Sequence, residues 1–305
     1  MTTMTTIDRR LRIAAPLGLA ALCLAACHPD ARPATQVSRP QLGAGFRWSV
    51  YGPKYNPGPE YWARVGREMA ARFPGATPEA IWIVSRVKGE GTVLNFPAPA
   101  GMPGIEGTAE DGNEAALALF DQLGFRVWLQ VEPSFVPVEP LIHVVLERYA
   151  HHRCVVGFGI DVEWYRSFNP DEGQPVTDAE ANAWLAAVRT HDPSYRLFLK
   201  HFEWGKMPPT AREGLLFVDD SQIFPSLDAM VEEFAEWAAR FAPAPVAFQF
   251  GYQTDRPWWS TLADPPGEIG RRILAVAPNT AALFWVDFSV LDVFPPGARP
   301  ASETP

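Results

Sequence analysis

Eight short apolar runs, separated by stretches with helical periodicity, constrain the fold of this 305-residue chain more than any other feature. Most of the runs are continuously apolar, as is typical of parallel strands buried on both faces. Eight such strands with intervening helices in about 250 residues predict an α/β fold of the (β/α)₈ TIM-barrel type. The predicted strands are 46–51, 81–86, 126–132, 155–163, 196–201, 215–219, 246–251 and 282–287.

A doubly wound open sheet is the competing architecture. It usually carries a glycine-rich phosphate turn after its first strand, and the sequence Tyr-Gly-Pro-Lys at 51–54 does not match that pattern. We therefore favour the barrel. Its helix 5 is expected to be short or missing, because the connection 202–214 is short and contains two prolines. No clear helix 8 follows residue 287.

Two helix ends can be predicted from capping residues. Thr177 and Glu180 form a capping-box pattern, in which the hydroxyl and the carboxylate bond the free amides at a helix start. A helix over 108–123 is expected to stop at Gly124, since glycine adopts the left-handed conformation common after a helix.

The N-terminus has the features of a lipoprotein signal peptide. Arginines at positions 9, 10 and 12 precede an apolar run, 13–24, which is too short to span a bilayer but has the length of a signal-peptide core. The run ends in Leu24-Ala25-Ala26-Cys27, which resembles the bacterial lipobox. The resemblance implies cleavage before Cys27 and lipid on that cysteine. Ordinary secretory cleavage after a small-residue site is the alternative.

The chain then divides into four parts. Residues 1–26 are the predicted signal peptide, and 27–43, which lack apolar periodicity and contain three prolines, are expected to form a tether. Residues 44–294 would form the barrel and the proline-rich 295–305 a disordered tail. The protein is therefore predicted to be exported and held on a membrane of the cell envelope through lipid on Cys27.

Charge and cysteine usage exclude several classes of partner and fold. The formal net charge is −9, and loss of the signal peptide, with three arginines and one aspartate, makes it more negative. This sign argues against nucleic acid as a partner. Cys154 has no pairing partner once Cys23 is removed and Cys27 is acylated, so no disulfide framework is expected. No cofactor is predicted, and nothing indicates the oligomeric state.

Polar residues stand at the carboxyl ends of seven consecutive predicted strands, the rim that carries the active site in a barrel. Several lie inside apolar runs, which a merely solvated strand edge explains poorly. The catalytic candidates are Glu132, Asp161, Glu163 and Asp220. The substrate-binding candidates are Arg86, Tyr165, Lys200, His201, Gln249, Tyr252, Trp285 and Asp287.

Asp161 and Glu163 are the most informative pair. Side chains alternate along a strand, so Asp161, Glu163 and Tyr165 would share one face. Two carboxylates in a poorly solvated cleft repel each other, which raises one pKa and leaves a protonated acid beside an ionised partner. Glycosidic cleavage requires this split: an acid for the departing oxygen and an anion for the developing positive charge.

Residues 157–165, Gly-Phe-Gly-Ile-Asp-Val-Glu-Trp-Tyr, resemble the fourth-strand signature of barrel glycoside hydrolases. The chitinase-like family eighteen has D-G-x-D-x-D-x-E, and the lysozyme-like family twenty-five has a shorter D-x-E. Against the longer pattern, Phe158 and Glu163 replace aspartates and Tyr165 stands where the catalytic glutamate belongs. The shorter pattern fits directly and implies Glu163 as the acid and Asp161 as its partner. The alternative for this pair is a structural network with Lys200 or with the arginine at position 86.

Two other carboxylate candidates have structural alternatives. Glu132 would serve as nucleophile or base, or would neutralise Lys88 or Lys200. One of Asp219 and Asp220 is expected to enter the cleft while the other caps the loop, and Asp220 is favoured because it begins the loop.

The histidines do not indicate a zinc enzyme. His201 follows an apolar strand at the rim, where a structural and a functional role are both open. His151 and His152 precede the fourth strand and are interpreted as a solvated helix end. The sequence has no H-E-x-x-H pattern, and no metal site is predicted, although a divalent ion on the rim carboxylates is the alternative.

These observations predict a lipid-anchored, glycoside-hydrolase-like enzyme that cleaves an envelope or environmental polysaccharide. A non-catalytic glycan-binding lipoprotein and a metal-dependent hydrolase on the same barrel are the alternatives. Burial is the default role of aromatic rings, but five tryptophans at predicted rim or loop positions could stack on sugars. They are Trp164, Trp204, Trp258, Trp259 and Trp285.

The lipobox generates the first prediction. Cys27→Ser should leave an unlipidated, full-length precursor, because the sulfur that receives the lipid is gone. Metabolic labelling with a radioactive fatty acid and membrane fractionation measure this. Unchanged processing and membrane partitioning of the variant would show that Cys27 is not the anchor.

Overall fold

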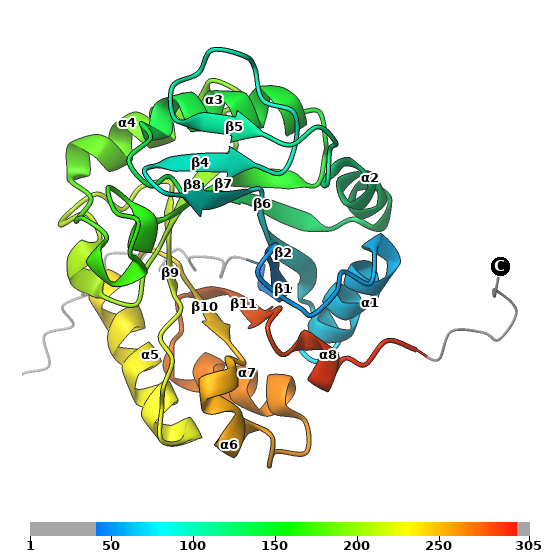
Figure 1. The fold of residues 1–305 in the computed structure, drawn as a ribbon. Coiled ribbons are helices and arrows are strands. Elements are labelled where there is room, and N and C mark those ends of the chain that lie inside the picture. The colour runs from blue at the N-terminus through cyan, green and yellow to red at the C-terminus, as the bar shows by residue number, and fades with distance from the viewer. Residues whose placement is uncertain (1–40, 298–305) are drawn as a thin grey trace, which may run out of the picture. The chain divides into compact units, whose positions relative to one another are not determined.

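The computed structural model describes residues 41–297, so the predicted signal peptide, most of the tether and the end of the proline-rich tail lie outside the described residues. Within them, eight parallel strands close into a barrel in the order β1-β11-β10-β9-β8-β7-β6-β2 (Figure 1). The predicted (β/α)₈ barrel is thus confirmed. The barrel strands are β1 (Gly43–Trp48), β2 (Thr77–Ile83), β6 (Arg126–Val131), β7 (Val155–Asp161), β8 (Arg196–Lys200), β9 (Leu215–Asp219), β10 (Val246–Phe250) and β11 (Thr280–Val286).

Helices cover the outside of the barrel (Figure 1). The long ones are α1 (Pro59–Ala70), α2 (Glu114–Leu123), α3 (Val138–Tyr149), α4 (Asp178–Arg189), α5 (Leu227–Phe241) and α7 (Pro265–Val276). The connection from β8 to β9 holds only the 3₁₀ turn Trp204–Lys206, and β11 is followed by the four-residue α8 (Val290–Val293). The expected loss of a full helix at these two places is confirmed. No helix within residues 41–297 has the length and apolarity needed to cross a bilayer.

The predicted capping residues act at two of these helices. Thr177 and Glu180 form the complete capping box at the start of α4. Gly124 follows α2 with a φ of 69°, a left-handed conformation that glycine adopts without steric cost. The start of α2 differs from the expectation, because the helix begins at Glu114 and the chain before it forms a strand and a loop.

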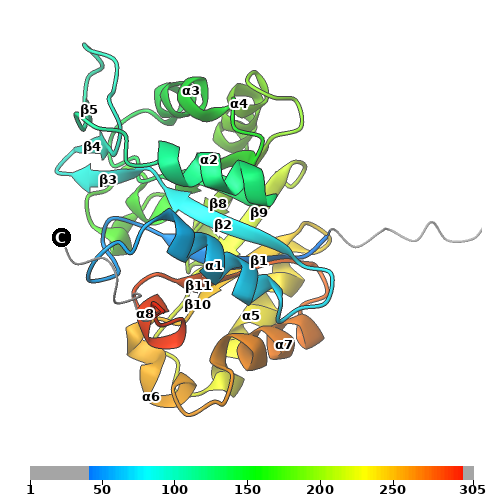
Figure 2. The ribbon, with the colours of Figure 1, turned by 90° about the vertical axis from the view of Figure 1, so that its right-hand side faces the viewer.

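A small sheet interrupts the barrel pattern after β2. Strands β3 (Ser85–Lys88), β4 (Gly91–Leu94) and β5 (Ile105–Gly107) pair with one another and lie beyond the carboxyl end of β2 (Figure 2). The predicted strand 81–86 therefore ends early, and its last residue, Arg86, belongs to the added sheet, where it pairs with Val93.

Glycines on the inner face of β7 make the barrel interior possible. Side chains alternate along the strand, so Gly157, Gly159 and Asp161 point inward. A Cβ on Gly159 would lie 2.0 Å from the ring of Phe198, and one on Gly157 would lie 2.2 Å from the carbonyl oxygen of Arg196. The ring of Phe198 thus fills the space that β7 leaves empty. This apolar layer lies directly below the polar rim.

This packing generates the second prediction. Gly159→Ala should destabilise the barrel by about 1–3 kcal/mol, because the added methyl overlaps a buried ring that has no room to move. Gly205→Ala is the control, since nothing lies within 4 Å of a Cβ there. Urea unfolding measures both. Equal stability of the two variants would contradict the assigned interior packing.

Candidate functional site

Lys200, the last residue of β8, holds three carboxylates together inside the barrel mouth. Its Nζ donates to Glu163 Oε1 at 2.5 Å and to Asp220 Oδ2, and lies 3.0 Å from Asp161 Oδ2. Strand register brings these groups together, because Asp161 pairs with Lys200 across β7 and β8, while Lys200 pairs with Val218, two residues before Asp220. All four charged side chains are at most 14% exposed.

Glu163 reaches this cluster through a turn that the sequence interpretation did not foresee. Strand β7 ends at Asp161, and Val162–Trp164 forms a 3₁₀ turn in which Asp161 Oδ1 accepts from the backbone N–H of Glu163 at 3.3 Å. The strand alternation is broken there. Tyr165 consequently points away from the cluster and donates its hydroxyl to Glu180 Oε1 at 2.8 Å. Its predicted place on a shared face with the two acids is wrong.

Glu132 forms a second, adjacent acidic position after β6. Its Oε2 accepts from the Tyr51 hydroxyl at 2.6 Å and from the backbone N–H of Val87 at 3.2 Å. The side chain is buried. Lys88 pairs with Glu106 instead, so the structure gives no ion pair between Glu132 and Lys88.

The environment divides these acids into protonated and ionised groups. Burial, followed by the charge of Asp161, raises the pKa of Glu132 to about 8. Burial also raises the pKa of Glu163 well above its usual range, and that of Asp161 to about 6 against the opposing charge of Lys200. For Asp220 burial acts in the same direction, but the charge of Lys200 and hydrogen bonds outweigh it and lower the pKa. At neutral pH, Glu132 is therefore mainly protonated and Asp220 is an anion, while burial favours the protonated form of Glu163.

An open cavity of about 370 Å³ lies over this cluster. Glu132, Asp161, Glu163, Lys200 and Asp220 all line it. Its remaining wall includes the guanidinium group of an arginine and four aromatic rings, namely those of Arg47, Tyr51, Trp164, Tyr252 and Phe288. Convergent polar groups with apolar ring faces around them are typical of small-molecule sites.

Two predicted binding residues, Gln249 on β10 and Tyr252 just after that strand, contact each other beside the acidic cluster. The Tyr252 hydroxyl is 3.3 Å from Gln249 Oε1 and 3.4 Å from Asp220 Oδ2. Gln249 is fully buried, and its Nε2 has no hydrogen-bond partner among the described residues. Tyr252 lines the cavity, whereas Gln249 is not among the lining residues and contacts the hydroxyl of Tyr252.

Asp287 contacts a residue of the cavity wall but does not line the cavity. Its Oδ2 accepts from the backbone N–H and the hydroxyl of Ser49 at 2.5 and 2.8 Å, and its Oδ1 lies 3.3 Å from Arg47 Nη1. Burial raises the pKa of Asp287 to about 6, against the opposing charge of Arg47. Asp287 thus fixes an arginine of the cavity wall without lining the cavity itself.

Three other predicted binding residues do not reach the cavity. Arg86 is exposed on β3. Trp285 points outward from β11 and donates to Ser289 Oγ at 2.9 Å, because strand alternation puts its neighbour Phe284 inside. His201 is buried, accepts from the backbone N–H of Glu203 at 2.8 Å, and has its pKa lowered to about 4 by burial. Of the five rim tryptophans, Trp164 is the one among the cavity-lining residues.

The sequence interpretation missed several residues of the site. Arg47 and Gln130 are polar residues inside apolar strands, and such a position is a signal for an inward polar side chain. Gln130 Nε2 donates to Asp161 Oδ2 at 3.1 Å. Tyr51 and Phe288 lie on loops after β1 and β11, and their sequence context gives no comparable signal.

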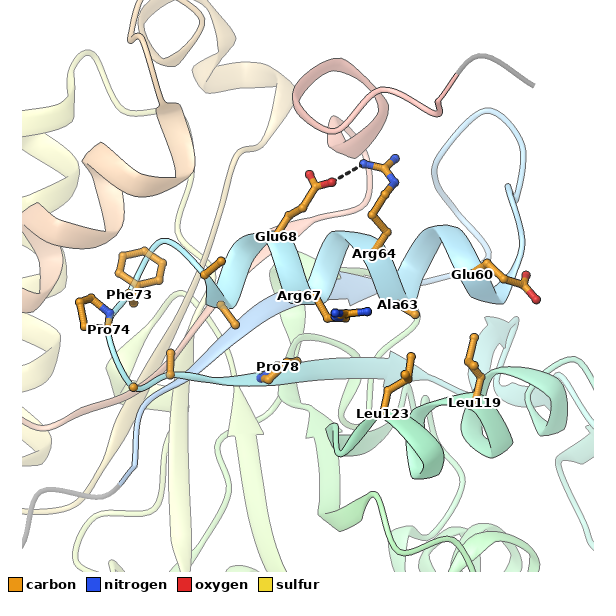
Figure 3. A pocket seen from close by; sticks show the side chains of 14 residues that line it. Glu60, Ala63, Arg64, Arg67, Glu68, Phe73, Pro74, Pro78, Leu119 and Leu123 are labelled. Atoms are coloured by element: carbon orange, nitrogen blue, oxygen red, sulfur yellow. Dashed lines mark hydrogen bonds and ion pairs between the residues drawn. The ribbon is translucent and has the colours of Figure 1, made fainter. Parts of the chain in front are cut away.

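A larger groove of about 760 Å³ lies on the outer surface, away from the residues at the carboxyl ends of the strands. Figure 3 shows it between α1 and α2, with Leu119 and Leu123 facing it. Its charged residues Arg64 and Glu68 pair with each other at 2.8 Å. The groove thus lacks the convergent polar groups of the barrel mouth.

Comparisons with known proteins give the fold but not the function. No protein family matches the sequence, and no curated protein matches it. A candidate alpha-L-fucosidase from Bacteroides thetaiotaomicron has a TM-score of 0.51 at 12% identity, over 86% of this chain and 90% of the other. An endocellulase from Pyrococcus horikoshii, solved with cellotetraose, has a TM-score of 0.45 at 10% identity, over 79% and 83%. The first likeness supports the barrel fold alone.

The raised pKa of Glu132 generates the third prediction. An acid whose pKa rises from 4.5 to about 8 on folding binds more protons in the native state, so stability falls as pH increases through that window. The melting temperature should therefore drop between pH 5 and pH 8. Glu132→Gln should reduce this drop in melting temperature. Each kcal/mol of unfolding free energy that the variant recovers at pH 8 corresponds to about 2–4 °C.

Scanning calorimetry at both pH values measures the effect, with Glu203→Gln on an exposed loop position as the control. If Glu132→Gln retains the wild-type difference between the two pH values, the carboxyl of Glu132 is not protonated in the folded protein at neutral pH.

Proposed function

We propose that the barrel mouth binds a carbohydrate and cleaves a glycosidic bond by carboxylate acid–base chemistry. One observation carries this proposal: protonated and ionised carboxyl groups line the same cavity, around one buried lysine. The fucosidase likeness bears on the fold alone, so the proposal rests on the site.

Glu163 is assigned as the general acid. It is the most exposed of the three carboxyl groups on Lys200, with 14% of its side chain accessible, and burial raises its pKa, which favours the protonated form that a general acid needs. Proton donation to the departing oxygen is the step that such a group performs. Asp161 is assigned as the anion that stabilises the developing positive charge, because its pKa of about 6 leaves it mainly ionised at neutral pH.

The separation of the two acids favours a retaining reaction over an inverting one. Asp161 Oδ2 and Glu163 Oε1 both contact Lys200 Nζ, at 3.0 and 2.5 Å, so the two oxygens lie no farther apart than those two distances together. Retaining enzymes keep their carboxyl groups about 5–5.5 Å apart, whereas inverting enzymes leave space for a water at about 6.5–9.5 Å. Asp161 is then also close enough to act as a nucleophile.

The walls of the cavity fit a sugar ring. Tyr51 and Phe288 are 48% and 38% exposed, and Trp164 also lines the cavity. Flat aromatic faces pack against the C–H surfaces of sugars, while Arg47 and Tyr252 offer hydrogen-bond donors. A cavity of about 370 Å³ accommodates a short glycan segment at its open side.

A non-catalytic glycan-binding barrel is the second candidate function. Its support is the hydrogen bond from Lys200 to Glu163, which engages the carboxyl group of the proposed acid. The metal-dependent hydrolase is less favoured, because the ammonium of Lys200 already lies between the three carboxylates that would ligate an ion.

We further propose that the enzyme acts at the cell envelope, anchored through lipid on Cys27. This proposal rests on the lipobox pattern of the sequence. An envelope or environmental polysaccharide is the corresponding substrate class.

The fourth prediction tests the acid. Glu163→Gln keeps the shape but removes the titrating proton, so hydrolysis of an unactivated polysaccharide should fall about 10²–10⁴-fold. The loss should be smaller on an aryl glycoside, whose leaving group needs little protonation. Asp161→Asn should lower both activities. Glu172→Gln, at an exposed position nearby, is the matched control.

Hydrolysis on a polysaccharide panel and melting temperature are measured together on all four proteins. Little change in melting temperature is expected for Glu163→Gln, because Lys200 retains two other carboxylates. Unchanged hydrolysis with a sharply lower melting temperature would overturn the catalytic assignment. Saturable glycan binding by a wild type that hydrolyses no member of the panel would establish the binding function instead.

A further inference from the structure

Three side chains of metal-binding type converge between α2 and the turn that follows α3. They are Glu114, the first residue of α2, and His151 and His152. One ligand atom of each lies within 4.8 Å of the other two. His152 Nε2 is 3.4 Å from one carboxylate oxygen of Glu114, and His151 Nε2 is 4.0 Å from the other.

His152 carries an unsatisfied ring nitrogen aimed into this cluster. Its side chain is only 4% exposed, which contradicts the expected solvated helix end. Nδ1 lies 2.8 Å from Asp121 Oδ2, while the buried Nε2 has no hydrogen-bond partner among the described residues. Buried polar atoms are rarely left unpaired, so this nitrogen points to a missing ligand.

The contact with Asp121 selects the form of the imidazole that binds metal. Donation from Nδ1–H to the carboxylate places the lone pair on Nε2, facing Glu114. Metal-binding histidines almost always have such a carboxylate or carbonyl partner on the second nitrogen, which orients the ring and raises its basicity.

We propose that Glu114, His151 and His152 form a zinc-binding site, with water at the fourth position. Zinc bonds of about 2.0–2.1 Å in a tetrahedral arrangement place neighbouring ligand atoms roughly 3.4 Å apart. His152 and Glu114 already have this spacing. The side chains of His151 and Glu114 are 61% and 49% exposed, so small rotations bring the third ligand into place.

Zinc at this position would connect α2 with the chain between α3 and β7. The ligands come from the first residue of α2 and from the turn after α3, two segments that the hydrogen bonds of Asp121 also join. Two imidazoles favour zinc over magnesium or calcium, which prefer oxygen ligands. The site lies outside the barrel mouth and is independent of the proposed hydrolysis.

The test measures zinc binding to the purified full-length protein, prepared without a histidine tag and treated with a chelator. Titration with zinc chloride against a chromophoric zinc indicator gives stoichiometry and affinity, and calorimetry gives the zinc-dependent rise in melting temperature. One zinc per chain and a higher melting temperature are expected. Magnesium chloride should produce neither.

Variants locate the site. Glu114→Gln and His152→Gln should each weaken zinc binding at least 10-fold and abolish the rise in melting temperature. Asp121→Asn should weaken binding about 10–100-fold through the orientation of His152. The matched control is His143→Gln, which disrupts the other histidine pair, where His143 Nδ1 lies 2.9 Å from His191 Nε2.

Glu114 is an exposed side chain, so Glu114→Gln tests the site even if loss of the buried His152 impairs folding. The proposal is overturned if the wild type binds no zinc saturably, if Glu114→Gln binds zinc as tightly as wild type, or if His143→Gln removes the binding.

Discussion

The buried ammonium of Lys200 is the interaction on which the barrel mouth depends. Burial of an unpaired charge costs several kcal/mol, and only well-placed opposite charges offset that cost. Asp161 and Asp220 supply them from the ends of β7 and β9, and Glu163 accepts a further hydrogen bond from the turn after β7. A shift in the register of β7, β8 or β9 would separate these partners. The pairing of these strands and the charge balance of the site therefore depend on each other.

The apolar layer beneath Lys200 determines how strongly the acids are perturbed. Gly159 leaves room for the ring of Phe198, which occupies the centre of the barrel one residue layer below Asp161. Water is thereby kept from the inner side of the carboxylates. Burial is the leading cause of the raised pKa values of Glu132, Asp161 and Glu163, so the exclusion of water from the barrel mouth favours the protonated forms of these groups.

Hydrophobic patterning predicted the barrel because each strand is marked by a local run of apolar residues. The polar residues at the rim followed from this, because the carboxyl ends of parallel strands meet at one rim of a barrel. Asp220 was favoured over Asp219 for the cleft because it begins the loop, and the structure has Asp220 on Lys200, while Asp219 accepts from the backbone N–H of Ser221. Prediction from the sequence failed where local geometry changes: the 3₁₀ turn after Asp161 redirects Tyr165, and the added sheet removes the arginine of β3 from the rim. The positions of the loop residues of the site depend on long-range packing, which no local sequence pattern encodes.

The protonation split also bears on how the lysine and the acid can coexist. Lys200 contacts the carboxyl groups of Asp161, Glu163 and Asp220. A substrate oxygen that displaced Lys200 from Glu163 would leave the ammonium paired with Asp161 and Asp220. In the proposed reaction, the same ammonium would stabilise the carboxylate that forms when Glu163 gives its proton to the leaving group. Ionised Asp161 would stabilise the positive charge that develops on the sugar. The lysine that binds the proposed acid would thus assist it during the reaction.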